Sequence, residues 1–132
     1  MIIEKRAVAC IVEYNGQILI GKKKLMEGNN MSGEWHIPGE KLLDGEEWEE
    51  AVHRGIMAEA GIRITIDELI TAYVNDHGFT VRWYRCSGSN PFPVAGEDLE
   101  DVKYAPKNQV RNFCGLNAVF MWPPEVRKYF EL

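Results

Sequence analysis

The sequence has few of the residues that would crosslink a small secreted domain or hold a structural metal. It contains three cysteines, Cys10, Cys86 and Cys114, with no C-x-x-C pair. This odd number favours neither a disulfide framework nor a zinc site, and we expect reduced structural thiols. No apolar run reaches the length of a membrane-spanning helix, and the N-terminus lacks a signal-peptide pattern. These absences predict a cytoplasmic protein without membrane contact.

Positive charge is also in the minority. The 15 basic and 20 acidic residues give a net charge of -5. This balance argues against a partner such as extended nucleic acid, which would need a basic face. A small phosphorylated ligand is compatible with it, because local lysines and a metal ion can overcome the overall field. A chain of 132 residues is long enough to bury a core and too short for two ordinary domains, and no repeat or linker divides it. We therefore expect a single domain over residues 1–132, and leave open whether it forms a homodimer.

The first third of the chain carries strand signals. Residues 2–14 include the apolar run Ala7–Val12, which is typical of a central strand buried on both faces. Asn15-Gly16 predicts a tight hairpin turn into a partner strand over residues 17–21. A further short strand is expected over residues 35–37.

The rest of the chain alternates between helix and strand signals. We expect a helix from Glu46 to Ala60, with Asp44 or Gly45 near its N-cap and Gly61 as a left-handed C-cap. The remaining expected elements are a hairpin of residues 62–74 and 79–86 around a turn at 75–78, a loop at 87–98, a strand at 102–104, and a last helix from Pro123-Pro124 to Tyr129. Together they predict an α+β fold, an α/β/α sandwich in which both helices pack on a mixed β-sheet.

The segment Gly39–Ile62 is the most informative part of the sequence. Its acids and glycines have the spacing of the Nudix box, G-x5-E-x7-R-E-U-x-E-E-x-G-U with U an aliphatic residue. The segment therefore resembles the signature of the Nudix hydrolase superfamily. The matching positions are Glu46, Arg54, Glu59, Gly61 and Ile62.

Three positions depart from the signature. Glu40 takes the place of its first glycine, Gly55 that of the glutamate after the arginine, and Ala58 that of the first glutamate of the late pair. Two of the four signature carboxylates are thus missing. Because Mg²⁺ can bind through one or two carboxylates, substrate phosphates and waters, the depletion does not exclude a metal site.

The resemblance implies roles for several residues. Mg²⁺ or Mn²⁺ would bind the carbonyl of Gly39 and the carboxylate of Glu59, with Glu46 or Asp98 as a further ligand. Arg54 would orient carboxylates, and a structural salt bridge with Glu50 at i, i+4 is the alternative. The resemblance thus implies that Glu59, Glu46 and Arg54 form the catalytic group.

Glu40 leaves two interpretations open. Its carboxylate could replace a missing ligand, or it could be an exposed loop acid, which we favour.

The end of the box, Met57-Ala58-Glu59-x-Gly61, is also similar to that of the GDP-mannose mannosyl hydrolases. In that branch one metal ion neutralises the departing nucleoside diphosphate, and a histidine in a late loop is the base. The corresponding loop here, residues 96–101, has no histidine, and Leu99 stands where the base would be.

Outside the box, a few side chains are candidates for substrate binding. Lys22 and Lys23 could steer a diphosphate or simply form a solvated edge. Trp83 could stack a base, although strand aromatics more often belong to the core. The histidines, His36, His53 and His77, are candidate bases with weak support.

Two functions are therefore compatible with the sequence. The first is a metal-dependent hydrolase of a nucleoside diphosphate linked to another group, of the nucleotide-sugar or nucleoside-triphosphate type. The second is a Nudix-like domain that binds a nucleotide or a protein partner without hydrolysis.

Overall fold

The computed structural model describes residues 4–25, 33–96 and 99–132 of the chain. Strands of one mixed sheet run in the order β3-β2-β1-β6-β5, while β4 pairs with β1 and β7 pairs with β2. The strands are β1 (Arg6–Tyr14), β2 (Gln17–Lys23), β3 (Trp35–His36), β4 (Gly39–Lys41), β5 (Ile64–Val74), β6 (Thr80–Gly88) and β7 (Leu99–Pro106). The helices are α1 (Trp48–Ala60), the 3-10 turn η1 (Lys107–Gln109), α2 (Val110–Phe113), α3 (Leu116–Met121) and α4 (Pro124–Tyr129).

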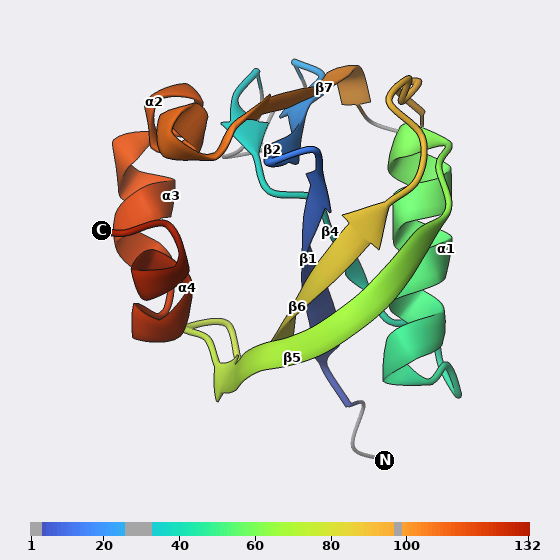
Figure 1. Ribbon diagram of the computed structural model, residues 1–132. Helices are drawn as coiled ribbons and strands as arrows, with labels where there is room; N and C mark the ends of the chain where they lie inside the picture. Colours follow the sequence, from blue (N-terminus) through green and yellow to red (C-terminus); the bar gives the residue numbers. More distant parts are fainter. Residues whose placement is uncertain (1–3, 26–32, 97–98) are drawn as a thin grey trace.

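The helices cover the sheet from both sides. Helix α1 lies against one face, and α2, α3 and α4 gather on the other (Figure 1). This arrangement confirms the predicted α/β/α sandwich around a mixed sheet. No helix in the described part of the chain combines the length and apolarity needed to cross a membrane. The three cysteines are buried free thiols.

Strand β1 separates two hydrophobic cores. Val8, Cys10 and Val12 belong to the core under α1, and Ile11 belongs to the core under the C-terminal helices. Successive side chains of a strand point to opposite faces, so one apolar run supplies both cores. The expectation of a strand buried on both faces is confirmed, although the strand begins at Arg6.

Strands β1 and β2 are joined by the predicted tight turn and then diverge. Asn15 and Gly16 have φ angles of 50° and 76°, as a type I′ turn requires. Strand β1 pairs with β2 only next to the turn, at Glu13–Ile18 and Tyr14–Gln17. Beyond this point the segment 35–41 fills the gap: β3 pairs with β2, and β4 pairs with β1.

The second hairpin and the last helix agree with the sequence pattern. Strands β5 and β6 flank a turn at residues 75–78, and α4 begins at Pro124. Strand β7 is longer than predicted, and β4, α2 and α3 were not predicted. Each of these three elements is short, and a short element has too few residues to display a hydrophobic period.

Helix α1 begins later than predicted. Its N-cap is Glu47, whose N–H donates to Oε1 of Glu50 at 3.0 Å. The placement of the N-cap at Asp44 or Gly45 is wrong, because a turn precedes the helix. Gly45 has a φ of 76°, and the N–H of Glu46 donates to the carbonyl of Leu43. The C-cap at Gly61, with a φ of 66°, is confirmed.

We expect the apolar face of α1 to carry much of the fold's stability. Ile56 is 1% exposed, whereas its neighbour Met57 is 44% exposed. Ile56→Ala should lower the free energy of unfolding by about 2–5 kcal/mol, because it leaves a cavity in the core. Met57→Ala, the matched control, should change it by less than about 1 kcal/mol. Urea titration measures both, and equal losses would contradict the assigned helix face.

Candidate metal centre

Glu59 is a buried carboxylate on the inner face of α1. It lies in the last turn of the helix and is 2% exposed. Gly55 lies one turn earlier on the same face and is also buried. The box spacing therefore places Glu59 inside the protein, against the sheet.

Gly39 lies where β4 touches β1, and its position requires a glycine. A Cβ on Gly39 would come 2.8 Å from the carbonyl oxygen of Val8. The N–H of Cys10 donates to the carbonyl of Pro38, and the N–H of Leu42 donates to that of Arg6. Since carbonyls alternate along a strand, that of Gly39 points away from β1.

A cleft brings Gly39 and Glu59 together. Its volume is about 410 Å³. The lining residues are Ala7, Val8, Lys23, Gly39, Glu40, Lys41 and Glu59. Two of the four sequence-predicted metal ligands therefore share one cleft with a predicted phosphate-binding lysine.

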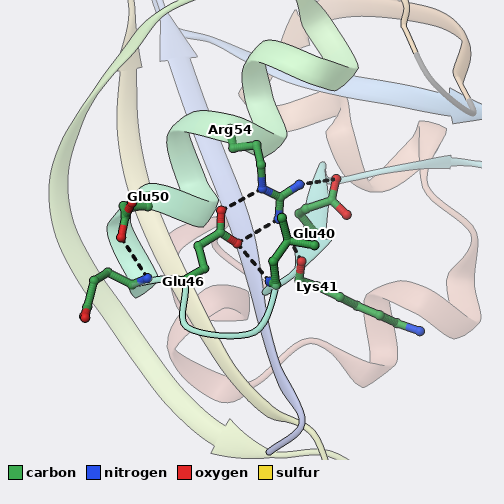
Figure 2. A network of polar contacts seen from close by, with 7 residues as sticks. Glu40, Lys41, Glu46, Glu50 and Arg54 are labelled. Carbon is green, nitrogen blue, oxygen red and sulfur yellow. Dashed lines mark hydrogen bonds and ion pairs between the residues drawn. The ribbon is translucent and has the colours of Figure 1, made fainter.

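The side chain of Arg54 connects helix α1 to the loop that precedes it (Figure 2). Its Nε and Nη2 donate to the two carboxylate oxygens of Glu46 at 2.7 and 2.9 Å. Nη2 also donates to the carbonyl of Lys41 at 2.9 Å, and Oε1 of Glu46 accepts from the N–H of Leu43 at 3.0 Å. The closest carboxylate partner of Arg54 is thus Glu46, and the alternative pairing with Glu50 is wrong, because Glu50 caps the helix instead.

This network determines the charge state of Glu46. The hydrogen bond from Arg54 is the main reason that its pKa is lowered, and the Leu43 N–H acts in the same direction. Glu46 is not among the residues that line the cleft with Glu59. Its observed partners give it a positioning role, and metal binding by Glu46 stays a prediction.

Glu40 is turned toward the helix. Its side chain is 23% exposed, lines the cleft and lies 3.7 Å from Nη1 of Arg54. The favoured interpretation as an exposed loop acid is wrong, because the pairing of β4 with β1 holds this residue at the helix surface.

The loop after β6 approaches the end of α1. Gly96 donates its N–H to the carbonyl of Glu59 at 3.0 Å, and a Cβ on Gly96 would come 2.3 Å from the carbonyl oxygen of Ala58. Asp98 lies outside the described residues, so its metal binding stays a prediction. Leu99 is 2% exposed and packs in the core under α1. The requirement for a glycine at position 96 was not evident from the sequence.

Lys22 and Lys23 are separated by the alternation of β2. Lys23 lines the cleft with Gly39 and Glu59. Nζ of Lys22 lies 3.0 Å from Oε1 of Glu100. The structure thus places one of the two lysines at the predicted site and pairs the other with an acid.

Trp83 lies on the opposite face of the sheet from α1. It is 6% exposed and packs edge-to-face against Trp122, with ring centroids 6.3 Å apart. It lines a small cavity of about 160 Å³ and a wider cleft of about 920 Å³ beside α3. Among the described residues, its buried Nε1–H has no hydrogen-bond partner.

The histidines lie away from the cleft that contains Glu59. His36 is 8% exposed, and its Nδ1 lies 2.9 Å from the carbonyl oxygen of Ile37. It lines the small cavity with Trp83 on the other face of the sheet. His53 and His77 are exposed. None of the three is among the residues that line the cleft.

Cys10 lies close to both carboxylates of the cleft. Burial is the main cause that raises the pKa of its thiol, and the negative charges of Cys86, Glu59 and Glu40 raise it further. The thiol is therefore neutral and unreactive near pH 7. Sequence reasoning did not place Cys10 at the site, although the alternation of β1 could have put its side chain on the helix side.

The donor set fits a hard divalent cation. Oxygen ligands from a strand carbonyl and one or two carboxylates suit Mg²⁺, which keeps several waters and binds substrate phosphates. No group of three or more His, Cys, Asp or Glu side chains in the described residues could hold a metal by itself. The described part of the site therefore suits an ion that shares its coordination with a phosphorylated ligand.

Comparison with known proteins agrees with this geometry. Residues 4–127 match the NUDIX domain family. The chain therefore belongs to the NUDIX family, and the resemblance of its box is confirmed. No curated protein matches the sequence.

Solved structures share the fold at low sequence identity. A NUDIX hydrolase from Nitrosomonas europaea superposes with a TM-score of 0.80 at 20% identity, over 97% of this chain and 70% of that one. An ADP-ribose pyrophosphatase from Streptococcus suis gives 0.65 at 14% identity, over 80% and 76%. A UDP-X diphosphatase gives 0.64 at 13% identity, over 82% and 53%.

The Arg54 network predicts a pH-dependent contribution to stability. Because the pKa of Glu46 is lower in the folded than in the unfolded protein, its ionised form stabilises the fold fully at pH values above the pKa of this carboxyl in the unfolded chain. Glu46→Gln should therefore cost about 1–2 kcal/mol of unfolding free energy at pH 7. The difference from wild type should shrink as the pH falls through the folded pKa. Urea titrations from pH 3 to pH 7 measure it.

Glu49→Gln is the matched control, because Glu49 is exposed on the same helix. This variant should show the same pH dependence of the unfolding free energy as wild type. If Glu46→Gln lowers the free energy of unfolding by the same amount at every pH, packing and not charge explains the contribution of Glu46 to stability.

Proposed function

We propose that the protein is a metal-dependent hydrolase of a nucleoside diphosphate linked to another group. The single observation that carries the proposal is the cleft in which the buried carboxylate of Glu59 meets Gly39. Mg²⁺ or Mn²⁺ would be held by the Gly39 carbonyl and Glu59, with Glu46 or Asp98 as a further ligand. When bound, the ion neutralises charge on the diphosphate.

The protein's own residues prepare the cleft for this chemistry. Arg54 joins α1 to the carbonyl of Lys41 in β4 and to Glu46 in the loop between β4 and the helix. Lys23 enters the cleft from β2 and would bind a phosphate oxygen. Such preorganised charges stabilise charge that develops during reaction without having to move.

Trp83 is the proposed contact for the base of the substrate. Two features support this placement. The indole Nε1–H is a buried donor with no partner among the described residues, and such groups usually have one. The cleft beside it also contains Tyr73 and Trp122, which offer apolar surface to a base.

Similar structures support the substrate class. One relative is named an ADP-ribose pyrophosphatase, and another a UDP-X diphosphatase. Both names describe a nucleoside diphosphate joined to another group. The identities of 14% and 13% are too low to transfer either substrate, so only the class is proposed.

The second candidate function is a domain that binds a nucleotide or a protein partner without hydrolysis. It is favoured by Gly55 and Ala58, which stand where the Nudix box has carboxylates. Loss of a general base typically costs on the order of 10²–10⁴ in rate. Ligand binding without turnover would identify this function.

We expect Glu59→Gln to abolish metal-dependent turnover while the protein stays folded, because an amide is a far weaker ligand for Mg²⁺ than a carboxylate. Activity is measured with Mg²⁺ or Mn²⁺ on a panel of nucleotide-sugars and nucleoside triphosphates. Glu49→Gln on the outer face of α1 is the control and should keep full activity. Unchanged turnover in Glu59→Gln would refute the assigned role.

The same panel in ¹⁸O-labelled water locates the bond that breaks. Phosphate NMR would show the label in the phosphate if water attacks phosphorus. Label in the released sugar would indicate attack at carbon, as in the mannosyl hydrolases that the end of the box resembles.

The two adjacent lysines provide a matched pair. Lys23→Met should lower kcat/KM by about 10-fold or more, since it removes a charge-assisted contact to the diphosphate. Lys22→Met should change it by less than about threefold, because Lys22 is not among the residues that line the cleft. Steady-state kinetics at fixed ionic strength measure both. Equal effects would show that the lysines act only through the overall field.

A further inference from the structure

We propose that Glu40 supplies the carboxylate that the box lacks at position 55. The inference rests on the proposed metal site and deepens it. The signature has a glycine at position 40 and a glutamate at position 55, and this chain has the reverse. The two departures would then compensate for each other in space. The carboxylate would reach the same face of α1 from strand β4 instead of from the helix.

The space around Gly55 supports this exchange. A Cβ on Gly55 would lie 2.9 Å from Cβ and 3.3 Å from Cγ of Glu40. Oε2 of Glu40 lies 3.9 Å from the same point. The Glu40 side chain therefore occupies the volume into which a side chain at position 55 would grow. The two positions cannot both carry a glutamate without a shift of β4 or α1.

The direction of the Glu40 side chain brings its carboxylate to the cleft. Glu40 follows Gly39 on β4, and both residues line the cleft with Glu59. Gly55 precedes Glu59 by one helical turn, so a side chain that packs on the helix surface at Gly55 lies beside Glu59. The cleft thus has two carboxylates and a strand carbonyl, and Mg²⁺ usually binds proteins through one or two carboxylates together with waters and substrate phosphates.

A purely structural salt bridge is the alternative role for Glu40. Nη1 of Arg54 lies 3.7 Å from Oε2 of Glu40, whereas Glu46 accepts two hydrogen bonds from Arg54 at 2.7 and 2.9 Å. Glu46 is thus the closer partner, and the contact with Glu40 is long for a hydrogen bond. Arg54 therefore lies near enough to orient the Glu40 carboxylate.

A double-mutant cycle tests the exchange. The variants are Glu40→Gly, Gly55→Glu and the two together, with Glu40→Gln to remove charge while preserving shape. The first readout is Mn²⁺ affinity without substrate, from the electron paramagnetic resonance signal of free Mn²⁺. The second is the melting temperature without metal. Neither readout depends on turnover.

Gly55→Glu alone should lower the melting temperature by about 5 °C or more, because its Cβ collides with Cβ of Glu40. Glu40→Gln should weaken Mn²⁺ binding by about 10-fold or more and shift the melting temperature by less than about 3 °C. The double variant should recover both properties to within about threefold in affinity and about 3 °C of wild type.

Three outcomes would overturn the inference. They are Mn²⁺ affinity in Glu40→Gln equal to that of wild type, a double variant no better than the poorer single variant, and no Mn²⁺ binding by wild type. The proposed hydrolysis fails separately. Mn²⁺ binding that depends on Glu40, without turnover of any substrate, would retain the inference and remove the activity. Turnover that needs Glu59 but not Glu40 would retain the proposed hydrolysis and remove the inference about Glu40.

Discussion

The separation of β1 from β2 is the constraint on which the rest of the structure depends. After their turn the two strands pair only briefly, and the segment 35–41 fills the gap between them. Within this segment the carbonyl of Pro38 accepts a hydrogen bond from the N–H of Cys10, and Gly39 lies against the carbonyl of Val8. Only glycine fits at that contact. The carbonyl that this geometry turns outward is the one assigned to the metal.

The helix meets this segment through one arginine. Arg54 binds the carboxylate of Glu46 and the carbonyl of Lys41, and so joins α1 to the loop before it and to β4. A planar guanidinium with several fixed donors can satisfy both partners at once, which a lysine could not do. The position of Glu59 relative to Gly39 therefore follows from a polar network at the start of the box as well as from the apolar packing of α1.

Much of the fold follows from local sequence patterns. The apolar run of β1, the Asn15-Gly16 turn and the C-cap at Gly61 each depend on residues adjacent in sequence, and their predictions are confirmed. The N-cap was wrong because Glu47 and Glu50 form a capping interaction where Asp44 and Gly45 are stronger single-residue signals. Strand β4 was missed because its pairing depends on the divergence of distant strands.

The candidate site also depends on a contact between elements that local sequence patterns do not reveal. The resemblance to a continuous motif implied Gly39 and Glu59 as metal ligands, and both residues line one cleft. The sequence left two interpretations of Glu40 open, with an exposed loop acid favoured, and showed only that position 55 lacks the signature glutamate. The close approach of β4 to α1 connects these two positions, and no periodicity in the sequence reports such a contact. Position by position the motif is depleted of acids, but the space beside Glu59 contains a carboxylate. A substitution that restores the motif at position 55 alone would therefore place two side chains in a volume that holds one.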